Sequence, residues 1–386
     1  MIRNLILLTA LCIIVHGSEH VNSQSCYISS EASTLLHNPT DFVSEPHEYF
    51  PAQIRDIVDA ANRISPDAIE LPNNHSYPVI DISSWMNPSA SNTEDRQHVV
   101  EQVLAEAISS GSFNFIGHGI EYALFDRLYS SADSFFSMSL EQKMLYHTGK
   151  NIVGYVADRT ESVDSVYKSG NSKEQKDLRE SYNMLYPPSS EGNFTGPSGF
   201  QDAMVEFTDH LLTVEVVLKQ IFTAALSSAK GIELPTTYLK DVEEDTTGQL
   251  RVSRYTNTPG FEDAIKLLPH SDWGTLTIIN SADEGLEEVR DGRWCKVPAK
   301  KGELHVNVGE MYAMLSNGLF KNNIHRVSSE AAMDRISFGY FTSQGTLTSN
   351  AGINPICSTG EESKFPRAST KSHVMHYMNK LTGSKI

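Results

Sequence analysis

The sequence predicts a mainly β fold with additional helices, because the two halves of the chain carry different patterns. From Leu250 to about Leu347, short β-favouring segments are separated by Gly, Pro, Asn and Asp, which is typical of a β-sandwich or a β-barrel. Before this region, apolar residues recur at the spacing of helices. With 386 residues, 39% of them hydrophobic and 20% charged, the chain can bury a sizeable core.

The first half is expected to mix strands and helices. Short strands are expected at 78–81 and 113–116, and helices around 54–61, 99–108, 122–138 and 200–230. Gly111 and Gly231 follow two of these helices and act as stop signals. The segment 157–197 is polar and rich in Ser, Gly and Pro, so we expect a surface excursion that borders the functional site.

Metal-binding side chains gather in the β-rich half. His270 and Asp272 lie two residues apart in the β-favouring run 267–279, and on a strand this spacing puts both side chains on one face. An imidazole and a carboxylate side by side can fill two positions around a metal ion. His325, fifty-five residues after His270, offers a third ligand. Two histidines and one carboxylate make the facial triad of non-heme Fe(II) oxygenases, which leaves positions open for a cosubstrate and O₂.

The order of these residues resembles the isopenicillin N synthase-like branch of the iron and 2-oxoglutarate-dependent dioxygenases. After the distal histidine His325, Arg335 follows ten residues later and Ser337 two residues after that. The surrounding runs are also similar to the family: 270–277 (His-Ser-Asp-Trp-Gly-Thr-Leu-Thr), 306–310, 316–327 and 117–120 (Gly-His-Gly-Ile). The resemblance covers about 77–378 of the chain.

The resemblance implies a double-stranded β-helix, or jelly roll, with flanking N-terminal helices and a C-terminal helix. The predicted organisation is a signal peptide at 1–18, an N-terminal extension at 19–77, an N-terminal α/β region at 78–240, the jelly-roll catalytic core at 241–350, and a C-terminal tail with a helix at 351–386. His118 lies outside the spacing of the triad, and we expect it to be a structural residue that forms hydrogen bonds.

The resemblance also implies an activity. His270, Asp272 and His325 would be the catalytic residues that hold Fe(II), with 2-oxoglutarate and O₂ at the open positions. The expected reaction oxidises, by default hydroxylates, a small organic substrate and releases succinate and CO₂. The prediction includes ascorbate as an accessory cofactor.

Three residues are expected to bind the cosubstrate 2-oxoglutarate. Arg335 and Ser337 lie two residues apart on a predicted strand, and a planar guanidinium beside a hydroxyl suits a carboxylate. Tyr255 matches a tyrosine that the family places at the same carboxylate. The chain departs from the plant members here, because their Asn-x-Tyr-Pro is Ser-Arg-Tyr-Thr at 253–256.

The charge of the chain limits its partners. A net charge of −17 leaves no basic field that would attract phosphates, so no nucleic-acid partner is expected. An anionic cosubstrate then needs local cations, and Arg251, Arg254 and Arg335 are the nearest ones in the sequence. Arg254 is expected to be a solvated surface residue, whereas Arg251 stays open between surface solvation and a role in binding.

Three other functions compete with this prediction. An oxidase of the isopenicillin N synthase type has the same triad and uses Fe(II) and O₂ without 2-oxoglutarate; its Arg-x-Ser pair grips a substrate carboxylate. A non-catalytic jelly-roll binding protein is disfavoured by the intact triad with Arg335 and Ser337. A zinc hydrolase is disfavoured because nothing nearby resembles the helical motif of a zinc site.

The N-terminus predicts entry into the secretory pathway, as a secreted or luminal protein. Arg3 precedes an apolar run at 5–15, and Gly17 and Ser18 follow it, which is the pattern of a secretory signal peptide. No membrane span is expected, and the oligomeric state is expected to be a monomer. Asn74 and Asn193 begin Asn-x-Ser/Thr triplets, so the protein is predicted to be a glycoprotein.

Cysteine usage fits this compartment without making the chain a disulfide scaffold. Removal of the signal peptide leaves three cysteines: Cys26, Cys295 and Cys357. At most one disulfide can form among three thiols, and one thiol stays free. The fold must therefore be stabilised by packing.

Overall fold

The computed structural model describes residues 57–65, 67–69, 77–149, 153–163, 176–186, 196–242, 248–255, 264–328, 335–342, 352–370, 373–374 and 376–377. Its helices are α2 (Ser83–Met86), α3 (Thr93–Ser109), α4 (Tyr122–Phe136), α5 (Leu140–Met144), α7 (Ser198–Lys230), α8 (Tyr238–Val242) and α9 (Glu310–Leu315). Its strands are β1 (Val79–Asp81), β2 (Ser112–Ile116), β3 (Gly154–Val156), β4 (Arg179–Tyr186), β5 (Gly248–Tyr255), β6 (Leu267–His270), β7 (Leu276–Ser281), β8 (Leu286–Arg290), β9 (Arg293–Lys296), β10 (Leu304–Val308), β11 (His325–Val327), β12 (Arg335–Phe341), β13 (Gly352–Ile353) and β14 (Ala368–Ser369).

Two sheets lie face to face in the β-rich half. The large sheet has the order β1-β2-β10-β7-β12-β5-β4-β3, and the small sheet has the order β6-β11-β8-β9. From β5 onward the chain passes repeatedly from one sheet to the other, since β5, β7, β10 and β12 belong to the large sheet and β6, β8, β9 and β11 to the small one. This alternation of strands between two sheets is that of a jelly roll, so the predicted mainly β fold with a double-stranded β-helix core is confirmed.

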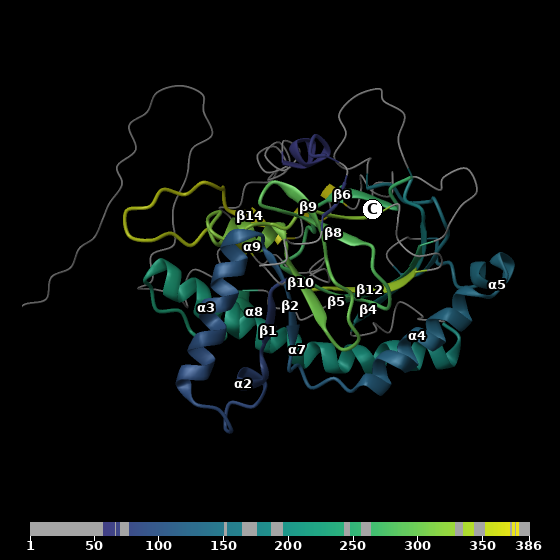
Figure 1. Cartoon of the computed structure of the whole chain (residues 1–386), viewed down its shortest axis with the longest axis horizontal. Coiled ribbons are helices and arrows are strands. Elements are labelled where there is room, and N and C mark those ends of the chain that lie inside the picture. Colours follow the sequence, from purple (N-terminus) through teal and green to yellow (C-terminus); the bar gives the residue numbers. More distant parts are fainter. Residues whose placement is uncertain are drawn as a thin grey trace, which may run out of the picture.

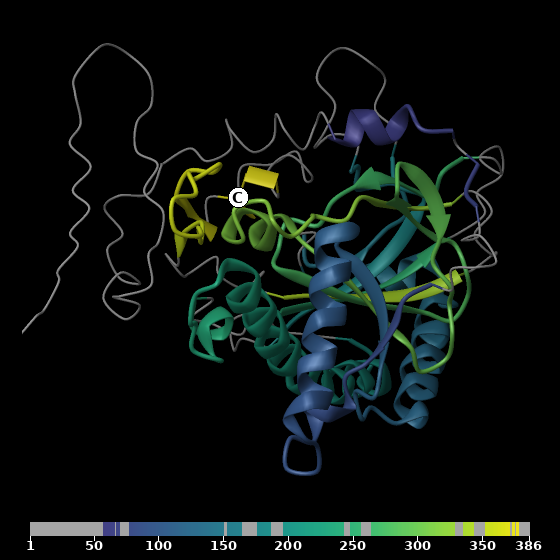
Figure 2. The same cartoon turned by 60° about the vertical axis from the view of Figure 1, so that its left-hand side comes forward.

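A layer of helices covers the outer face of the large sheet. In Figure 1, α4 and α7 lie below the strands of the large sheet and α3 lies beside them on the left, while β6, β8 and β9 lie above; the turned view of Figure 2 brings the blue helix α3 to the front. The longest helix, α7, packs against both α3 and α4. It ends where Gly231 adopts a left-handed conformation with φ of 65°, which glycine tolerates without steric cost.

By length and apolar composition, α7 could cross a membrane. However, 61% of its most apolar window is buried inside the protein, which also characterises the core helix of a globular domain. Its buried side chains include Phe207, Leu211, Leu218 and Phe222, which belong to the main hydrophobic core. Because the search covers only the described residues, the expected absence of a membrane span stays a prediction.

The expected helices and the first two strands are confirmed, with ends shifted by a few residues. The helix that covers 99–108 begins earlier, at Thr93, because the side chain of Asn92 accepts a hydrogen bond from the Asp95 amide and caps it. Of the helix expected at 54–61, the described residues 57–61 are helical. In the tail, the described residues 373–374 and 376–377 are helical.

The expectation of a surface excursion at 157–197 is wrong for residues 179–186, but the expected position of this segment beside the functional site is confirmed, because Val163 and Arg179 line the cavity that holds the metal cluster. Residues 179–186 form β4, which pairs with β5 along its whole length inside the large sheet. The first six residues of β4 are buried although most are polar. Their polarity is compensated by buried ion pairs, such as Arg179 with Glu161, and this compensation cannot be read from the composition of the segment.

Candidate active site

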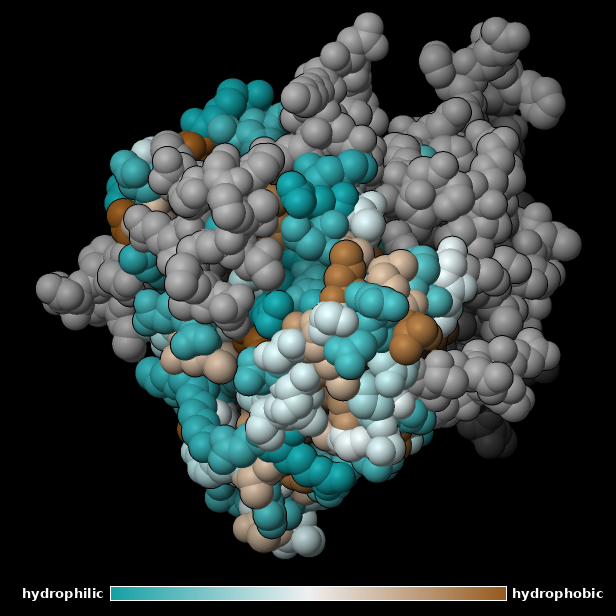
Figure 3. Space-filling view, turned by 90° about the vertical axis from the view of Figure 1, so that its right-hand side faces the viewer, coloured by the Kyte–Doolittle hydropathy of each residue, from teal (hydrophilic) through white to brown (hydrophobic). Residues whose placement is uncertain are grey.

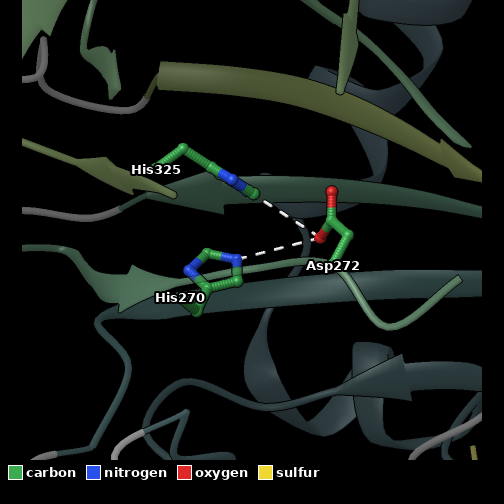
Figure 4. A group of neighbouring side chains, drawn as sticks. All are labelled: His270, Asp272 and His325. Atoms are coloured by element: carbon green, nitrogen blue, oxygen red, sulfur yellow. Dashed lines mark ion pairs between the residues drawn. The ribbon is translucent and has the colours of Figure 1, made fainter. Parts of the chain in front are cut away.

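The three expected metal ligands lie at the open end of the small sheet. His270 is the last residue of β6 and His325 is the first residue of β11, and the two residues stand opposite each other in the pairing of these strands. Asp272 was expected on the same strand as His270, but it lies beyond the end of β6, in the turn that leads to β7. All three side chains point toward one another (Figure 4).

The geometry of the cluster fits one divalent metal ion. His270 Nε2 lies 4.0 Å from Asp272 Oδ1, His325 Nε2 lies 3.8 Å from the same atom, and one ligand atom from each residue lies within 4.8 Å of the others. Neighbouring ligands about 2.1 Å from a first-row metal are roughly 3 Å apart, so a small contraction around the ion suffices. The buried Asp272 Oδ2 has no hydrogen-bond partner in the described structure, which is costly unless a cation faces it.

Both imidazoles present Nε2 to this cluster. His270 Nδ1 lies 2.8 Å from the carbonyl oxygen of Leu268 and donates its hydrogen to it, so the lone pair is on Nε2. Burial, and next the neighbouring His325, lower the pKa of His270 well below its usual value. His270 is therefore neutral at pH 7, which is the form that binds a metal.

A hydrogen-bonded row orients the second imidazole. His325 Nδ1 lies 3.4 Å from the Asn307 amide, and the other end of this amide lies 2.7 Å from His305 Nε2. Amide oxygen and nitrogen are assigned from such networks. In the structure, Asn307 Oδ1 faces His305 Nε2 and its Nδ2 faces His325 Nδ1; with neutral histidines, the opposite orientation of this amide lets Asn307 donate to His305 Nε2 and accept from His325 Nδ1. His305 Nδ1 then donates to Asn114 Oδ1 at 2.9 Å.

The three residues expected to bind 2-oxoglutarate share one cavity with the metal cluster. This cavity has an empty volume of about 870 Å³ and is lined by Tyr255, His270, Asp272, His325, Arg335 and Ser337, among others. Arg335 stands opposite Tyr255 in the pairing of β12 with β5, and its Cζ lies 5.1 Å from the centre of the Tyr255 ring. Arg335 Nη1 donates to Ser337 Oγ at 3.3 Å. The three side chains therefore form one polar wall of the cavity.

The C-terminal tail supports the turn that carries Asp272. Glu310, fully buried, accepts a hydrogen bond from Ser271 at 2.6 Å and lies 3.0 Å from His373 Nε2 of the tail. The ring of Tyr377 stacks on Trp273, which lines the cavity, with ring centres 5.0 Å apart. The tail therefore contacts Trp273 directly and Ser271 through Glu310.

Sequence reasoning missed a group of charged residues in the same cavity. Arg179, on β4, lines it together with Arg251, and both arginines form ion pairs with the buried Glu161. A run of alternating polar residues at 179–183 could have indicated one polar face of a strand, but no motif singled it out.

Of the two interpretations left open for Arg251, surface solvation is wrong, because Arg251 is 9% exposed and lines the cavity; its role in binding stays a prediction. The expectation for Arg254 is wrong. Its side chain is only 18% exposed, pairs with Glu180 at 2.9 Å and packs on Phe136, on the opposite side of β5. Residues an odd number of positions apart on a strand point to opposite faces, so the side chains of Arg251 and Arg254, three positions apart, point to opposite faces of β5.

His118 lies apart from the metal cluster. One ring nitrogen lies 2.9 Å from the Gly302 carbonyl oxygen, and Nδ1 accepts a hydrogen bond from the Ile120 amide. Both nitrogens are therefore used in hydrogen bonds to backbone groups, as expected for a structural histidine.

Comparisons with known proteins agree with this site. A family model described as "non-haem dioxygenase in morphine synthesis N-terminal" matches residues 77–202, and the model of the "2OG-Fe(II) oxygenase superfamily" matches residues 246–344. Gibberellin 3-beta-dioxygenase 2-3 of Triticum aestivum is 28% identical over 312 residues, which cover 78% of this chain and 81% of the relative. The bi-functional coumaroyl CoA and feruloyl CoA ortho-hydroxylase of Ipomoea batatas is 22% identical and covers 82% of this chain and 84% of the relative.

Solved structures share the fold. The dioxygenase for auxin oxidation of rice superposes with a TM-score of 0.61 at 18% identity and covers 80% of this chain and 96% of that one. The two family models together match more than half of the chain. The chain therefore belongs to the iron(II)- and 2-oxoglutarate-dependent dioxygenases, oxidoreductases that use Fe(II), 2-oxoglutarate and O₂ to oxidise small molecules.

Proposed function

We propose that this dioxygenase hydroxylates a small organic substrate with its metal held by His270, Asp272 and His325. In the balanced reaction, a C–H bond of the substrate becomes C–OH while 2-oxoglutarate and O₂ give succinate and CO₂. Bound Fe(II) supplies the oxidation chemistry at this cluster. The protein residues supply binding, orientation and exclusion of water.

The observation that carries the proposal is a buried cation in the cavity that has no carboxylate partner among the described residues. Arg335 is 1% exposed, and its guanidinium donates to the Asp283 carbonyl oxygen and to the Ser337 hydroxyl, neither of which is charged. Burial lowers the pKa of Arg335, which means that the site disfavours its charge when no anion is bound. A buried guanidinium without a counter-ion is unfavourable, so a ligand carboxylate at this position would stabilise it.

The geometry around Arg335 matches the distal carboxylate of 2-oxoglutarate. Two parallel N–H donors of a guanidinium suit the two oxygens of a carboxylate, and the hydroxyl of Ser337 stands beside them. Tyr255 completes the wall from the neighbouring strand. This end of the cavity would fix the cosubstrate, while the metal cluster would receive its other end.

The substitution Arg335→Lys tests this assignment. Lysine keeps the charge but loses the planar pair of donors, so we expect the KM for 2-oxoglutarate to rise by at least about tenfold. The measurement is the formation of succinate by Fe(II)-loaded protein in air. Arg254→Lys, on the opposite face of the sheet, is the control and should leave this KM unchanged. Equal KM values for wild type and Arg335→Lys would contradict the proposed role of Arg335.

We further propose that the protein enters the secretory pathway and carries glycan at Asn74 or Asn193. The support is the Arg3 and 5–15 pattern at the N-terminus, together with the disulfide-bonded state of Cys357. Cys295 is a buried free thiol, and the partner of Cys357 lies outside the described residues, as do both sequons. Disulfides persist mainly in oxidising compartments.

Mass spectrometry of the protein isolated from its natural source tests this localisation. We expect a mature chain that starts near Ser18 or Glu19, with glycan on one of the two asparagines. An intact Met1 on a chain without glycan would contradict the secretory proposal and would leave the enzymatic one untouched.

We also propose that the protein acts as a monomer. On the side of the molecule that carries α5, hydrophobic colours form scattered spots among hydrophilic ones over the described residues (Figure 3). The exposed large hydrophobic residues there include Leu140, Met144 and Leu145. Light scattering should give the mass of one chain, and the mass of two chains would contradict the proposal.

A further inference from the structure

Besides Arg335, which is proposed to bind the cosubstrate, two further buried arginines line the cavity. Arg179 and Arg251 both line it, and each is 9% exposed. They come from neighbouring strands, since Arg251 lies on β5 and Arg179 on β4. If Arg335 binds the distal carboxylate of 2-oxoglutarate, these two guanidiniums are available for a different ligand.

The pairing of β5 with β12 places Arg251 away from Arg335, the residue that is proposed to bind the cosubstrate. Tyr255 stands opposite Arg335, whereas Arg251 stands opposite Gly339. Four residues of strand separate Tyr255 from Arg251, which corresponds to about 13 Å along the sheet. Because side chains alternate, Tyr255 and Arg251 still face the same cavity. The cavity therefore has a cosubstrate end and an Arg251 end. Arg179 stands opposite Tyr255 in the pairing of β4 with β5, and its side chain reaches toward Arg251 through their shared contact with Glu161.

The floor of the Arg251 end is open and apolar. Gly339 lines the cavity opposite Arg251 and has no side chain; a Cβ there would come within 3.3 Å of the Phe341 ring. Val163 and Phe341 also line the cavity. The buried hydroxyl of Thr277 lies in the same lining and has no hydrogen-bond partner in the described structure. This end suits a ligand with an apolar body and a polar group.

The two arginines share their counter-ions and retain unused donors. Arg251 Nη1 and Nη2 lie 3.2 and 3.4 Å from the two oxygens of Glu161, while Arg179 Nη2 lies 3.1 Å from Glu161 and 3.3 Å from Asp177. These distances exceed the roughly 2.7–2.9 Å of close charge-assisted bonds. Arg179 Nε is buried and has no partner in the described residues.

Asp177 is a weak counter-ion. It is almost fully buried, and this burial raises the pKa of its carboxyl, although Arg179 counteracts the rise. Glu161 contacts both guanidiniums, whereas Asp177 contacts only Arg179. Arg251 therefore relies on Glu161 alone as its carboxylate partner among the described residues.

We propose that the substrate is an organic acid with an apolar body, and that Arg251, with Arg179 beside it, binds its carboxylate. The inference rests on the proposed function, because it assigns the substrate to the end of the cavity that 2-oxoglutarate leaves open. The apolar body would lie between Val163 and Phe341, and the carboxylate would take the free N–H donors of the two arginines.

Matched pairs of acids and amides test this proposal. The probes are phenylacetate, cinnamate, 3-phenylpropanoate and octanoate, each compared with its primary amide, which has nearly the same shape but no charge. Binding is measured by anaerobic calorimetry on protein loaded with Fe(II) and 2-oxoglutarate. We expect at least one acid to bind tighter than its amide by about tenfold or more. A panel in which no acid binds better than its amide overturns the proposal.

Two substitutions with opposite expected effects exclude a merely structural role. Arg251→Gln should weaken binding of the acid by at least about tenfold without affecting the amide, whereas Glu161→Gln removes a competing carboxylate and should strengthen binding of the acid. Arg254→Gln, on the same strand and the opposite face, is the control and should change neither. Retention of the acid preference in Arg251→Gln also overturns the proposal.

The same samples distinguish this proposal from the one on which it rests. Wild type and Arg251→Gln should both bind 2-oxoglutarate alone with the same affinity in calorimetry, because Arg335 lies at the other end of the cavity. If wild type does not bind 2-oxoglutarate, the proposed role of Arg335 fails. If 2-oxoglutarate binds and no acid binds more tightly than its amide, only the substrate proposal fails.

Discussion

The residues of the metal cluster are positioned by contacts of different kinds. The Leu268 carbonyl fixes the ring of His270, the Asn307 amide contacts the ring of His325, and the turn that carries Asp272 is supported by Glu310 through Ser271. None of these contacts requires the metal to be present. A preformed cluster lowers the cost of ordering ligands when the ion binds.

Removal of any one ligand should therefore empty the site without unfolding the chain. We expect His270→Ala, Asp272→Ala and His325→Ala each to lower Fe(II) affinity by at least about tenfold. Loss of a residue that only hydrogen-bonds to a metal ligand already lowers metal affinity by about this factor. Calorimetry with Fe(II) under anaerobic conditions measures the affinity, and circular dichroism monitors the fold.

His118→Ala is the matched control for this series. His118 contacts Gly302 and Ile120 and lies outside the cluster, so its removal should leave Fe(II) binding intact. An empty site in His118→Ala together with normal binding in His325→Ala would show that the ligands are wrongly assigned.

The residues of the site differ in how well the sequence predicts them. His270, Asp272, His325, Arg335 and Ser337 stand at fixed spacings within two short runs, so their pattern is visible in the sequence. Their roles stay predictions, although the structure places all of them in one cavity. Arg179 and Glu161 are not part of any such run. Arg179 and Arg251 come together at Glu161 only because β4 pairs with β5, which joins parts of the chain about 70 positions apart.

At the scale of elements, β10 connects the metal cluster with the interior of the protein. Its residue His305 is buried between Asn114 on β2 and Asn307 on its own strand, and Glu288 lies 3.8 Å away on β8. Burial lowers the pKa of His305 to about 4, although the nearby Glu288 counteracts this effect. When His305 is neutral, the hydrogen bonds that link Asn114, His305, Asn307 and His325 keep a single set of donors and acceptors.

This shift predicts how stability depends on pH. An unfolded histidine has a pKa of about 6.5, so between pH 6.5 and pH 4 the unfolded chain binds a proton that the folded His305 does not. The contribution of His305 is complete above pH 6.5 and is lost as the pH falls toward 4. The expected slope is about 1 kcal/mol per pH unit within this window.

Urea unfolding of the metal-free protein at pH 7.5, 6.5 and 5.5 measures this slope. His305→Gln should lose stability less steeply than wild type as the pH falls, because the titrating group is gone. His98→Gln, which changes an exposed residue of α3, should keep the wild-type slope. Identical slopes for wild type and His305→Gln would show that His305 is not held neutral.

Helices were easier to predict than strands for a physical reason. In α4 and α7, a period near 3.6 residues separates the buried face from the exposed one, and caps such as Gly231 mark their ends. In β4, both faces are buried in the described structure and the side chains are polar, so neither alternation nor hydrophobicity identifies a strand.

At the scale of the whole molecule, the residue pattern alone, without the resemblance to a known family, predicts only a β-sandwich or a β-barrel. The order of strands in the two sheets depends on pairings such as β10 with β2, which join residues about 190 positions apart. Local propensity contains no information on such pairings. The resemblance supplied the jelly roll, and the structure confirms it through the alternation of β5 to β12 between two sheets.

The whole fold brings Arg335 and the metal cluster into one cavity, and this arrangement has a direct spectroscopic test. When 2-oxoglutarate alone is added to anaerobic, Fe(II)-loaded protein, a metal-to-ligand charge-transfer band should appear in the visible spectrum. Succinate, which lacks the keto oxygen needed for chelation, should give no band. Absence of a band with 2-oxoglutarate, together with O₂ consumption in the presence of another carboxylate substrate, would contradict the account and would identify an oxidase that works without 2-oxoglutarate.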